Sequence, residues 1–142
     1  MKLLIVDDEP LVSVGIQSMV DWKKLNLELL SPAFNGKQAL DLIEKYSPEI
    51  VITDIKMPIM TGLELMKYCR EKNNDLPIFI LLTVYEDFKY AKEAISFGAF
   101  DYLTKLDLTT ETLEDVLQRA KKAVPRFIAD CFSRKSNLLH GK

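Results

Sequence analysis

Residues 47–64 read SPEIVITDIKMPIMTGLE, and this stretch contains one complete strand–helix unit. A serine–proline pair breaks the chain, and the apolar run that follows, Ile50–Thr53, predicts a buried strand. Asp54 comes directly after this strand. The four residues Thr61-Gly62-Leu63-Glu64 form a capping box, in which the threonine and glutamate side chains bind free backbone amides at a helix start. A helix is therefore predicted from Thr61 to about Lys72.

The same alternation extends in both directions from this stretch. Short apolar runs predict five strands, at Lys2–Val6, Leu27–Ser31, Ile50–Thr53, Ile78–Leu82 and Ala99–Leu103. Amphipathic segments predict helices at Pro10–Val20, Asn35–Tyr46, Thr61–Lys72 and Phe88–Gly98, with a last helix from Thr110. Such strict alternation indicates a parallel sheet that is covered by helices on both faces.

The composition of the strands predicts their order. The first, third and fourth strands are almost continuously apolar, as strands in the interior of a parallel sheet are. The second and fifth strands carry the charged residues Glu28 and Asp101, which suits the two edges of the sheet. The predicted fold is therefore α/β, a flavodoxin-like doubly wound five-stranded parallel sheet in the order 2-1-3-4-5.

Length and composition limit the class of protein. The chain has 142 residues, 48% of them apolar and 28% charged, which is typical of one globular domain. No apolar run approaches the roughly 18 residues of a membrane-spanning helix, and no secretory signal is evident, so we expect a cytoplasmic location without membrane contact. The net charge of −2 gives no general attraction to nucleic acid. Cys69 and Cys131 lack metal-ligand spacing, and His140 is the only histidine, so no histidine-based site is expected.

Five polar residues follow the predicted strands at one edge of the sheet. Asp7 and Asp8 end the first strand and Asp54 the third, while Thr83 follows the fourth strand and Lys105 the fifth. Ligands of open parallel sheets bind beyond the carboxyl ends of the strands, where the strand order reverses. Each of these residues taken alone is as well explained by a helix cap or a solvated loop. Their shared position favours a functional site.

The chemistry of this set points to phosphoryl transfer. Three crowded carboxylates repel one another, and a hard cation such as Mg²⁺ would relieve that repulsion. A carboxylate can attack a phosphoryl group to form an acyl phosphate. The Lys105 ammonium and the Thr83 hydroxyl would then stabilise charge on the transferring oxygens.

The sequence resembles the receiver domain of bacterial two-component response regulators over about residues 1–124. The resemblance rests on the motifs VDDEP (residues 6–10), DIKMPIMTGL (residues 54–63), Thr83 and YLTK (residues 102–105). Asp21-Trp22 and YEDFKYA (residues 85–91) are similar to the YesN-type subgroup, in which the receiver precedes an AraC-type DNA-binding region.

The resemblance implies a role for each matching residue. Asp54 would be the phospho-acceptor. Asp8, Asp54 and the backbone carbonyl of Lys56 would ligate Mg²⁺, and Asp7 would act mainly through a metal-bound water. Thr83 would bind the phosphoryl group.

Lys105 would pair with a phosphoryl oxygen, and Tyr102 would change rotamer when Thr83 moves. Lys56 and Tyr85 occupy positions that tune the lifetime of the acyl phosphate. The donor would be a phosphohistidine on a sensor histidine kinase, and phosphorylation would switch the surface of the fourth helix, fifth strand and fifth helix and could favour a homodimer.

Two residues depart from the family pattern. Leu106 replaces the proline that normally follows the lysine in a cis peptide bond. Because a non-proline cis bond costs roughly 2.5–4 kcal/mol, a trans Lys105–Leu106 bond is expected. Val84 is bulkier than the small residues common at its position, and we hypothesise that it slows phosphoryl entry or hydrolysis.

Residues 125–142 stand apart from the predicted domain of residues 1–124. Their apolar residues could form one amphipathic stripe, belonging either to an additional packed helix or to a linker that leads to an absent output domain. Because no helix-turn-helix sequence is present, DNA binding is expected only through such an output domain.

Two further functions compete with a phosphorylation switch. A degenerate receiver would be an interaction module that needs no phosphate, which the Leu106 substitution favours and the intact acidic set opposes. A Mg²⁺-dependent phosphatase would need a cap domain or a general acid two residues beyond the nucleophile, where Lys56 stands. Apart from its own phosphorylation and dephosphorylation, the chain is not expected to be an enzyme.

Overall fold

The computed structural model describes residues 1–72 and 76–124, except for the side chain of Tyr85. The elements follow the chain in the order β1 (Lys2–Val6), α1 (Pro10–Met19), β2 (Glu28–Leu29), α2 (Gly36–Tyr46), β3 (Ile50–Asp54), α3 (Gly62–Lys72), β4 (Ile78–Thr83), a 3-10 turn η1 (Tyr85–Asp87), α4 (Phe88–Ser96) and β5 (Asp101–Thr104). A last helix occupies residues 110–124. The predicted amphipathic stripe at residues 125–142 lies outside the described residues.

The five strands form one parallel sheet in the order β2-β1-β3-β4-β5, which confirms the predicted topology. The charged strands β2 and β5 are the edges, as predicted. β2 is shorter than the predicted Leu27–Ser31, because only Glu28 and Leu29 pair in register with β1. The inner strands β1, β3 and β4 are almost completely buried, which explains their apolar sequences. The edge strands β2 and β5 are partly exposed, which explains why they carry charged residues.

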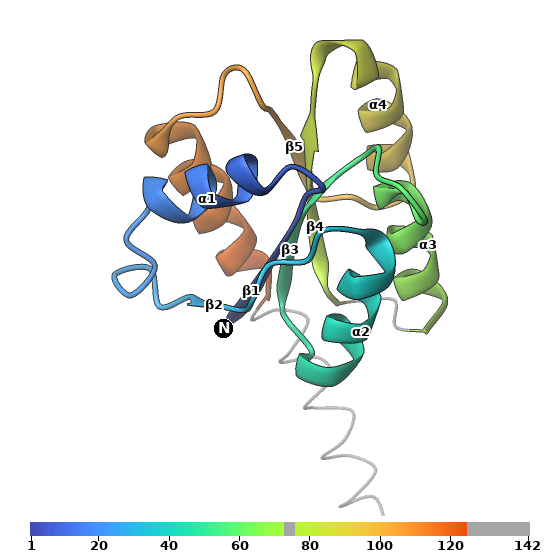
Figure 1. Cartoon of the computed structure of the whole chain (residues 1–142). Helices are drawn as coiled ribbons and strands as arrows, with labels where there is room; N and C mark the ends of the chain where they lie inside the picture. The colour runs from blue at the N-terminus through green and yellow to red at the C-terminus, as the bar shows by residue number, and fades with distance from the viewer. Residues whose placement is uncertain (73–75, 125–142) are drawn as a thin grey trace, which may run out of the picture.

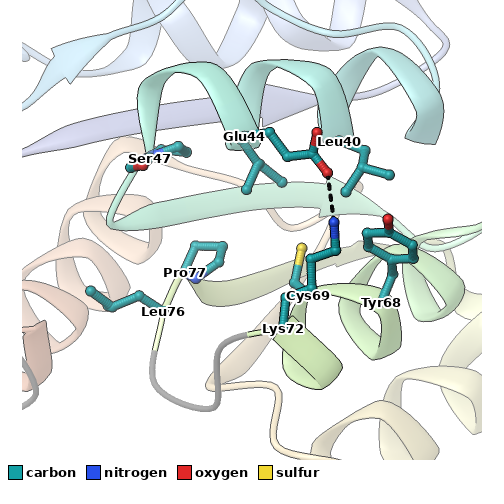
Figure 2. Close-up of a pocket in the computed structure, with 10 residues that line it drawn as sticks. Leu40, Glu44, Ser47, Tyr68, Cys69, Lys72, Leu76 and Pro77 are labelled. Carbon is teal, nitrogen blue, oxygen red and sulfur yellow. Dashed lines mark hydrogen bonds and ion pairs between the residues drawn. The ribbon is translucent and has the colours of Figure 1, made fainter.

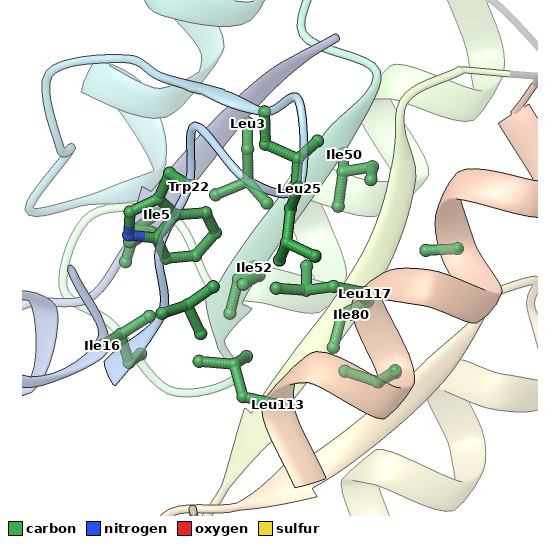
Figure 3. Close-up of a cluster of buried hydrophobic side chains, with 14 of the residues drawn as sticks. Leu3, Ile5, Ile16, Trp22, Leu25, Ile50, Ile52, Ile80, Leu113 and Leu117 are labelled. Atoms are coloured by element: carbon green, nitrogen blue, oxygen red, sulfur yellow. The ribbon is translucent and has the colours of Figure 1, made fainter. Parts of the chain in front are cut away.

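Helices cover both faces of this sheet (Figure 1). On one face, α1 and the helix of residues 110–124 enclose a buried cluster that includes Ile16, Ile52 and Leu117. The connection between α1 and β2 adds Trp22 and Leu25 to this cluster (Figure 3). The Trp22 indole nitrogen donates to the Gln17 carbonyl at 2.9 Å, so the ring is buried without an unpaired donor.

The opposite face is covered by α2, α3 and α4 (Figure 1). The predicted capping box is present at the start of α3, and a side-chain cap also begins α2 on this face. The Asn35 side chain accepts a hydrogen bond from the Gln38 amide, and the Thr61 hydroxyl accepts one from the Glu64 amide. Within residues 1–72 and 76–124, no helix has the length and apolar character needed to cross a membrane.

Candidate functional site

Asp7 and Asp54 lie at the carboxyl ends of the neighbouring strands β1 and β3. Val6 pairs with Thr53 in register, so the two aspartates are the next residues along adjacent strands. Both side chains are buried. Asp7 also shapes its own turn, because its Oδ1 accepts a hydrogen bond from the Glu9 amide at 2.8 Å.

These two aspartates belong to a cluster of four carboxylates. Asp7, Asp8, Glu9 and Asp54 each offer a carboxylate oxygen, and these oxygens all lie within 4.8 Å of one another. Asp7, Asp8 and Asp54 were predicted at this site, whereas Glu9 was not. Its position as the third acidic residue of the run Asp7-Asp8-Glu9 was the signal that could have included it.

Lys105 reaches into this cluster from the end of β5. Its ammonium lies 2.9 Å from Asp7 Oδ2, 3.1 Å from Asp54 Oδ2 and 3.4 Å from Glu9 Oε1. The Lys105 amide donates to the Thr83 carbonyl at 2.9 Å, which continues the pairing of β5 with β4. The Lys105–Leu106 bond is trans, as expected, and Lys105 is nevertheless held against Asp54.

Burial and charge shift the pKa of these groups. Burial raises the pKa of Asp54 to about 6, and the nearby Asp7 carboxylate adds to this effect while Lys105 opposes it. Burial also raises the pKa of Asp7. Burial lowers the pKa of Lys105, but its ion pairs with Asp7 and Asp54 outweigh burial, so the pKa is raised overall.

Four carboxylates therefore face one ammonium, and the cluster has an excess of negative charge. Oxygen ligands at this spacing suit a hard divalent cation, which would offset that charge. The donor set fits Mg²⁺, with Asp7, Asp8, Glu9 and Asp54 as possible ligands. The predicted contribution of the Lys56 backbone carbonyl stays a prediction.

Thr83 ends β4 at the same edge of the sheet. The preceding residue, Leu82, pairs with Asp54 in register, so Thr83 lies one step beyond Asp54. Thr83 is buried, and its hydroxyl donates to the Val84 carbonyl at 2.9 Å. The predicted hydrogen bond to a phosphoryl group would require this hydroxyl to leave that carbonyl.

Tyr102 lies on β5 beside Leu81 and is half-buried. Its ring packs edge-to-face on Phe88 of α4, with ring centroids 5.2 Å apart. This contact connects β5 with the start of α4. The predicted change of rotamer at Tyr102 stays a prediction.

Lys56 extends from the loop between β3 and α3 toward α4. Its ammonium lies 3.0 Å from Asp87 Oδ1 and 5.1 Å from the centre of the Tyr90 ring. The hydrogen bond and charge of Asp87 raise the pKa of Lys56. The sequence analysis noted Asp87 only as part of a motif, and its pairing with Lys56 was missed.

The loop that carries Lys56 folds tightly against the end of β3. The Gly62 amide donates to the Ile55 carbonyl at 2.8 Å. A Cβ atom at Gly62 would lie 2.2 Å from the Asp54 carbonyl oxygen, so no larger residue fits without displacing the backbone. The glycine thus allows α3 to begin directly beside Asp54.

A hollow of about 220 Å³ lies between α2 and α3, away from the acidic cluster (Figure 2). It is lined by residues that precede β3 and β4, including Pro48 and Pro77, and so lies at the amino ends of the strands. Its rim carries the ion pair of Glu44 with Lys72 at 3.2 Å. Burial raises the pKa of the Cys69 thiol in its wall to about 11. Because reactive thiols have lowered pKa values, this hollow offers no chemistry that rivals the acidic cluster.

Comparison with known proteins agrees with the geometry. Residues 3–118 match the response regulator receiver domain family. The transcriptional regulatory protein YesN of Bacillus subtilis is 36% identical over 124 residues, which cover 85% of this chain and 33% of YesN. The chain thus spans about a third of the length of this relative.

Two solved structures share the fold at higher coverage. The receiver domain of AraT from Geobacillus stearothermophilus is 38% identical with a TM-score of 0.81, covering 88% of this chain and 95% of that one. A two-component transcriptional regulator AraC from Clostridium phytofermentans is 31% identical with a TM-score of 0.80, covering 89% and 96%. This chain belongs to the response regulator receiver domain family.

Proposed function

We propose that Asp54 accepts a phosphoryl group from a phosphohistidine of a sensor histidine kinase, in a reaction that depends on Mg²⁺. One observation carries this proposal: the buried Asp54 carboxylate lies within a cluster of acidic groups and 3.1 Å from the Lys105 ammonium. A carboxylate oxygen of Asp54 would attack phosphorus and form an acyl phosphate. The bond between phosphorus and the donor imidazole would break, and the imidazole would leave with that electron pair.

The acidic residues would hold the cation. Asp8, Asp54 and the backbone carbonyl of Lys56 would ligate Mg²⁺, with Asp7 acting mainly through a water, and Glu9 is close enough to contribute. When bound, Mg²⁺ would supply positive charge to the acidic cluster and to the phosphoryl oxygens. The cation would thereby lower the pKa of Asp54 and offset the effect of its burial.

Lys105 and Thr83 would stabilise the phosphoryl group. Lys105 already contacts Asp54, so it needs only a small movement to pair with a phosphoryl oxygen. Thr83 would exchange its hydrogen bond to the Val84 carbonyl for one to the phosphoryl group. Tyr102, packed on Phe88, would pass this movement to the surface formed by α4, β5 and the helix of residues 110–124.

The changed surface would act on an output domain. The relatives above are transcriptional regulators, and the chain covers a third of YesN, so we propose that this receiver controls a DNA-binding domain outside the chain. Phosphorylation would favour a homodimer through the changed surface. The cytoplasm is the expected location, where a kinase phosphohistidine is accessible.

Intact mass spectrometry tests the proposal. The protein would be incubated with Mg²⁺ and a small phosphodonor, beside Asp54→Asn. We expect one phosphoryl adduct on the original protein and none on the variant. No adduct on folded protein would contradict the proposal and favour the phosphate-independent interaction module, for which Leu106 is the main sequence argument.

A further inference from the structure

One ion pair connects the two loops that follow the acceptor strand and the threonine strand. Asp87, at the end of η1, is buried. Lys56, two residues after Asp54, has a side chain that is 62% exposed, and its ammonium lies 3.0 Å from Asp87 Oδ1. The same ammonium lies over the ring of Tyr90, one helical turn further along α4. The loop beside Asp54 is thus attached to the start of α4.

The two partners depend on this pair to different degrees. A buried carboxylate that lacks a partner is costly, whereas an exposed lysine can be solvated by water. The pair therefore compensates the charge of Asp87, and in return the position of Asp87 restrains Lys56.

We propose that Asp87 is a positioning residue for the cation site: it holds Lys56, and thereby the loop whose Lys56 backbone carbonyl serves as a metal ligand. This inference rests on the proposed function, because it concerns the Mg²⁺ of that function. It adds a physical connection between the cation and the start of α4, through backbone and side chain of a single lysine.

If the ion pair acted on the cation site only through charge, substitution of Lys56 would change the Mg²⁺ affinity in the opposite direction. If the two residues acted only through their charges, Lys56→Gln would remove positive charge and tighten Mg²⁺ binding, while Asp87→Asn would weaken it. If they act as a positional connection, both substitutions release the loop and both weaken binding. Lys56→Arg retains the charge and the ion pair, so it should bind as the original protein does.

Isothermal titration of the unphosphorylated protein with MgCl₂ separates these cases. We expect the dissociation constant to rise about tenfold for both Asp87→Asn and Lys56→Gln, the lower end of the effect of groups that orient metal ligands. Lys72→Gln is the matched control, because Lys72 is 60% exposed and paired with Glu44 at the opposite end of the sheet. It should leave the dissociation constant unchanged.

Circular dichroism of each variant would establish that it is folded. Lys56→Gln leaves the buried Asp87 carboxylate without its partner and could unfold the protein. Asp87→Asn leaves only the exposed Lys56 without a partner, so this variant keeps the test valid. Tighter binding by Lys56→Gln, or unchanged binding by Asp87→Asn, would overturn the inference while leaving the proposed function intact. Absence of Mg²⁺ binding by the original protein would overturn both.

Hydrogen exchange gives a second readout that does not depend on affinity. In the original protein, amides of residues 84–91 should exchange more slowly at saturating Mg²⁺ than without Mg²⁺, because the fixed loop restrains the start of α4. In saturated Asp87→Asn this protection should be lost. Equal protection in the two proteins would show that the ion pair does not connect the cation with α4.

Discussion

The Asp54 carboxylate is ionised at neutral pH against the influence of its surroundings. Its pKa of about 6 lies above the ordinary value of 3.8, so the folded state holds this proton more tightly than the unfolded state does. Stability contributed by Asp54 therefore falls as pH rises from about 4 to 6, and at pH 7 the ionised group costs up to roughly 3 kcal/mol. An ionised carboxylate at position 54 therefore destabilises the folded state, which favours a functional role for Asp54 over a structural one.

Asp54→Asn should consequently stabilise the protein without Mg²⁺. We expect the free energy of unfolding at pH 7 to rise by about 1 to 3 kcal/mol, and the gain to disappear below about pH 4, where Asp54 is protonated in both the folded and the unfolded original protein. Urea denaturation at both pH values measures this. The exposed Asp41→Asn is the control and should change little, and an Asp54→Asn variant no more stable than the original at pH 7 would contradict the argument.

Val84 offers a prediction about rate. Its side chain is partly exposed directly after Thr83, and its carbonyl accepts the Thr83 hydroxyl. If its bulk restricts access to Asp54, Val84→Ala should raise the rates of phosphorylation by a small phosphodonor and of acyl phosphate hydrolysis several-fold. Time-resolved intact mass spectrometry gives both rates, Val84→Ile should slow them, and unchanged rates in Val84→Ala would show that access is not restricted.

Residues were predictable where the strand positions decide their place. Asp7, Asp54 and Lys105 follow strands whose carboxyl ends meet at one edge, so periodicity was enough to bring them together. Asp87 was not predictable in this way. Its pairing with Lys56 depends on the path of two loops and on one lysine rotamer, and no sequence period encodes either.

Among the elements, the loop between β3 and α3 has the tightest constraint. Gly62→Ala would place a Cβ atom 2.2 Å from the Asp54 carbonyl oxygen. We expect it to lower the free energy of unfolding by about 2 kcal/mol or more, since the close partner is backbone, and to slow phosphorylation by shifting Asp54.

Gly15→Ala in α1 is the matched control, because no atom lies within 4 Å of its added Cβ. It should raise stability by up to about 1 kcal/mol through helix propensity. Chemical denaturation of both variants gives the comparison. Equal stability of Gly62→Ala and Gly15→Ala would mean that the loop between β3 and α3 can shift at little energetic cost.

The same loop contains a strained residue. Ile59 has a φ of 73° and is 75% exposed, a conformation that is unfavourable for a β-branched side chain. Ile59→Gly should therefore raise the free energy of unfolding by about 1 kcal/mol, while Ile59→Val should give no gain. Thermal denaturation tests this, and a loss of stability in the glycine variant would show that the isoleucine side chain stabilises the loop.

The types and order of the elements were predictable, but several of their ends were not. β5 was expected at Ala99–Leu103 and is observed at Asp101–Thr104. The difference arises because Gly98, with a φ of 107°, and Ala99 are used to end α4, where the Ala99 amide donates to the Ala94 carbonyl. Apolar periodicity does not distinguish a residue that closes a helix from one that opens a strand.

At the scale of the whole molecule, the described part of the chain ends with the helix of residues 110–124. The helix of residues 110–124 contributes five buried side chains to one of the two apolar clusters, and Val124 is the last of them. The predicted domain boundary leads to a testable expectation: a chain ending at residue 124 should unfold cooperatively and should accept a phosphoryl group to the extent proposed for the longer chain. Differential scanning calorimetry and intact mass spectrometry would measure this, and failure to fold would place part of residues 125–142 inside the domain.

The strand order β2-β1-β3-β4-β5 has a consequence for synthesis on the ribosome. Each strand after β1 pairs with a strand that was made before it, so the sheet can grow outward as the chain emerges. The apolar face beside α1 cannot be covered in the same stepwise way, because the helix of residues 110–124 that covers it is made after all five strands. We therefore expect the nascent chain to present an open apolar surface to chaperones until residue 124 has emerged.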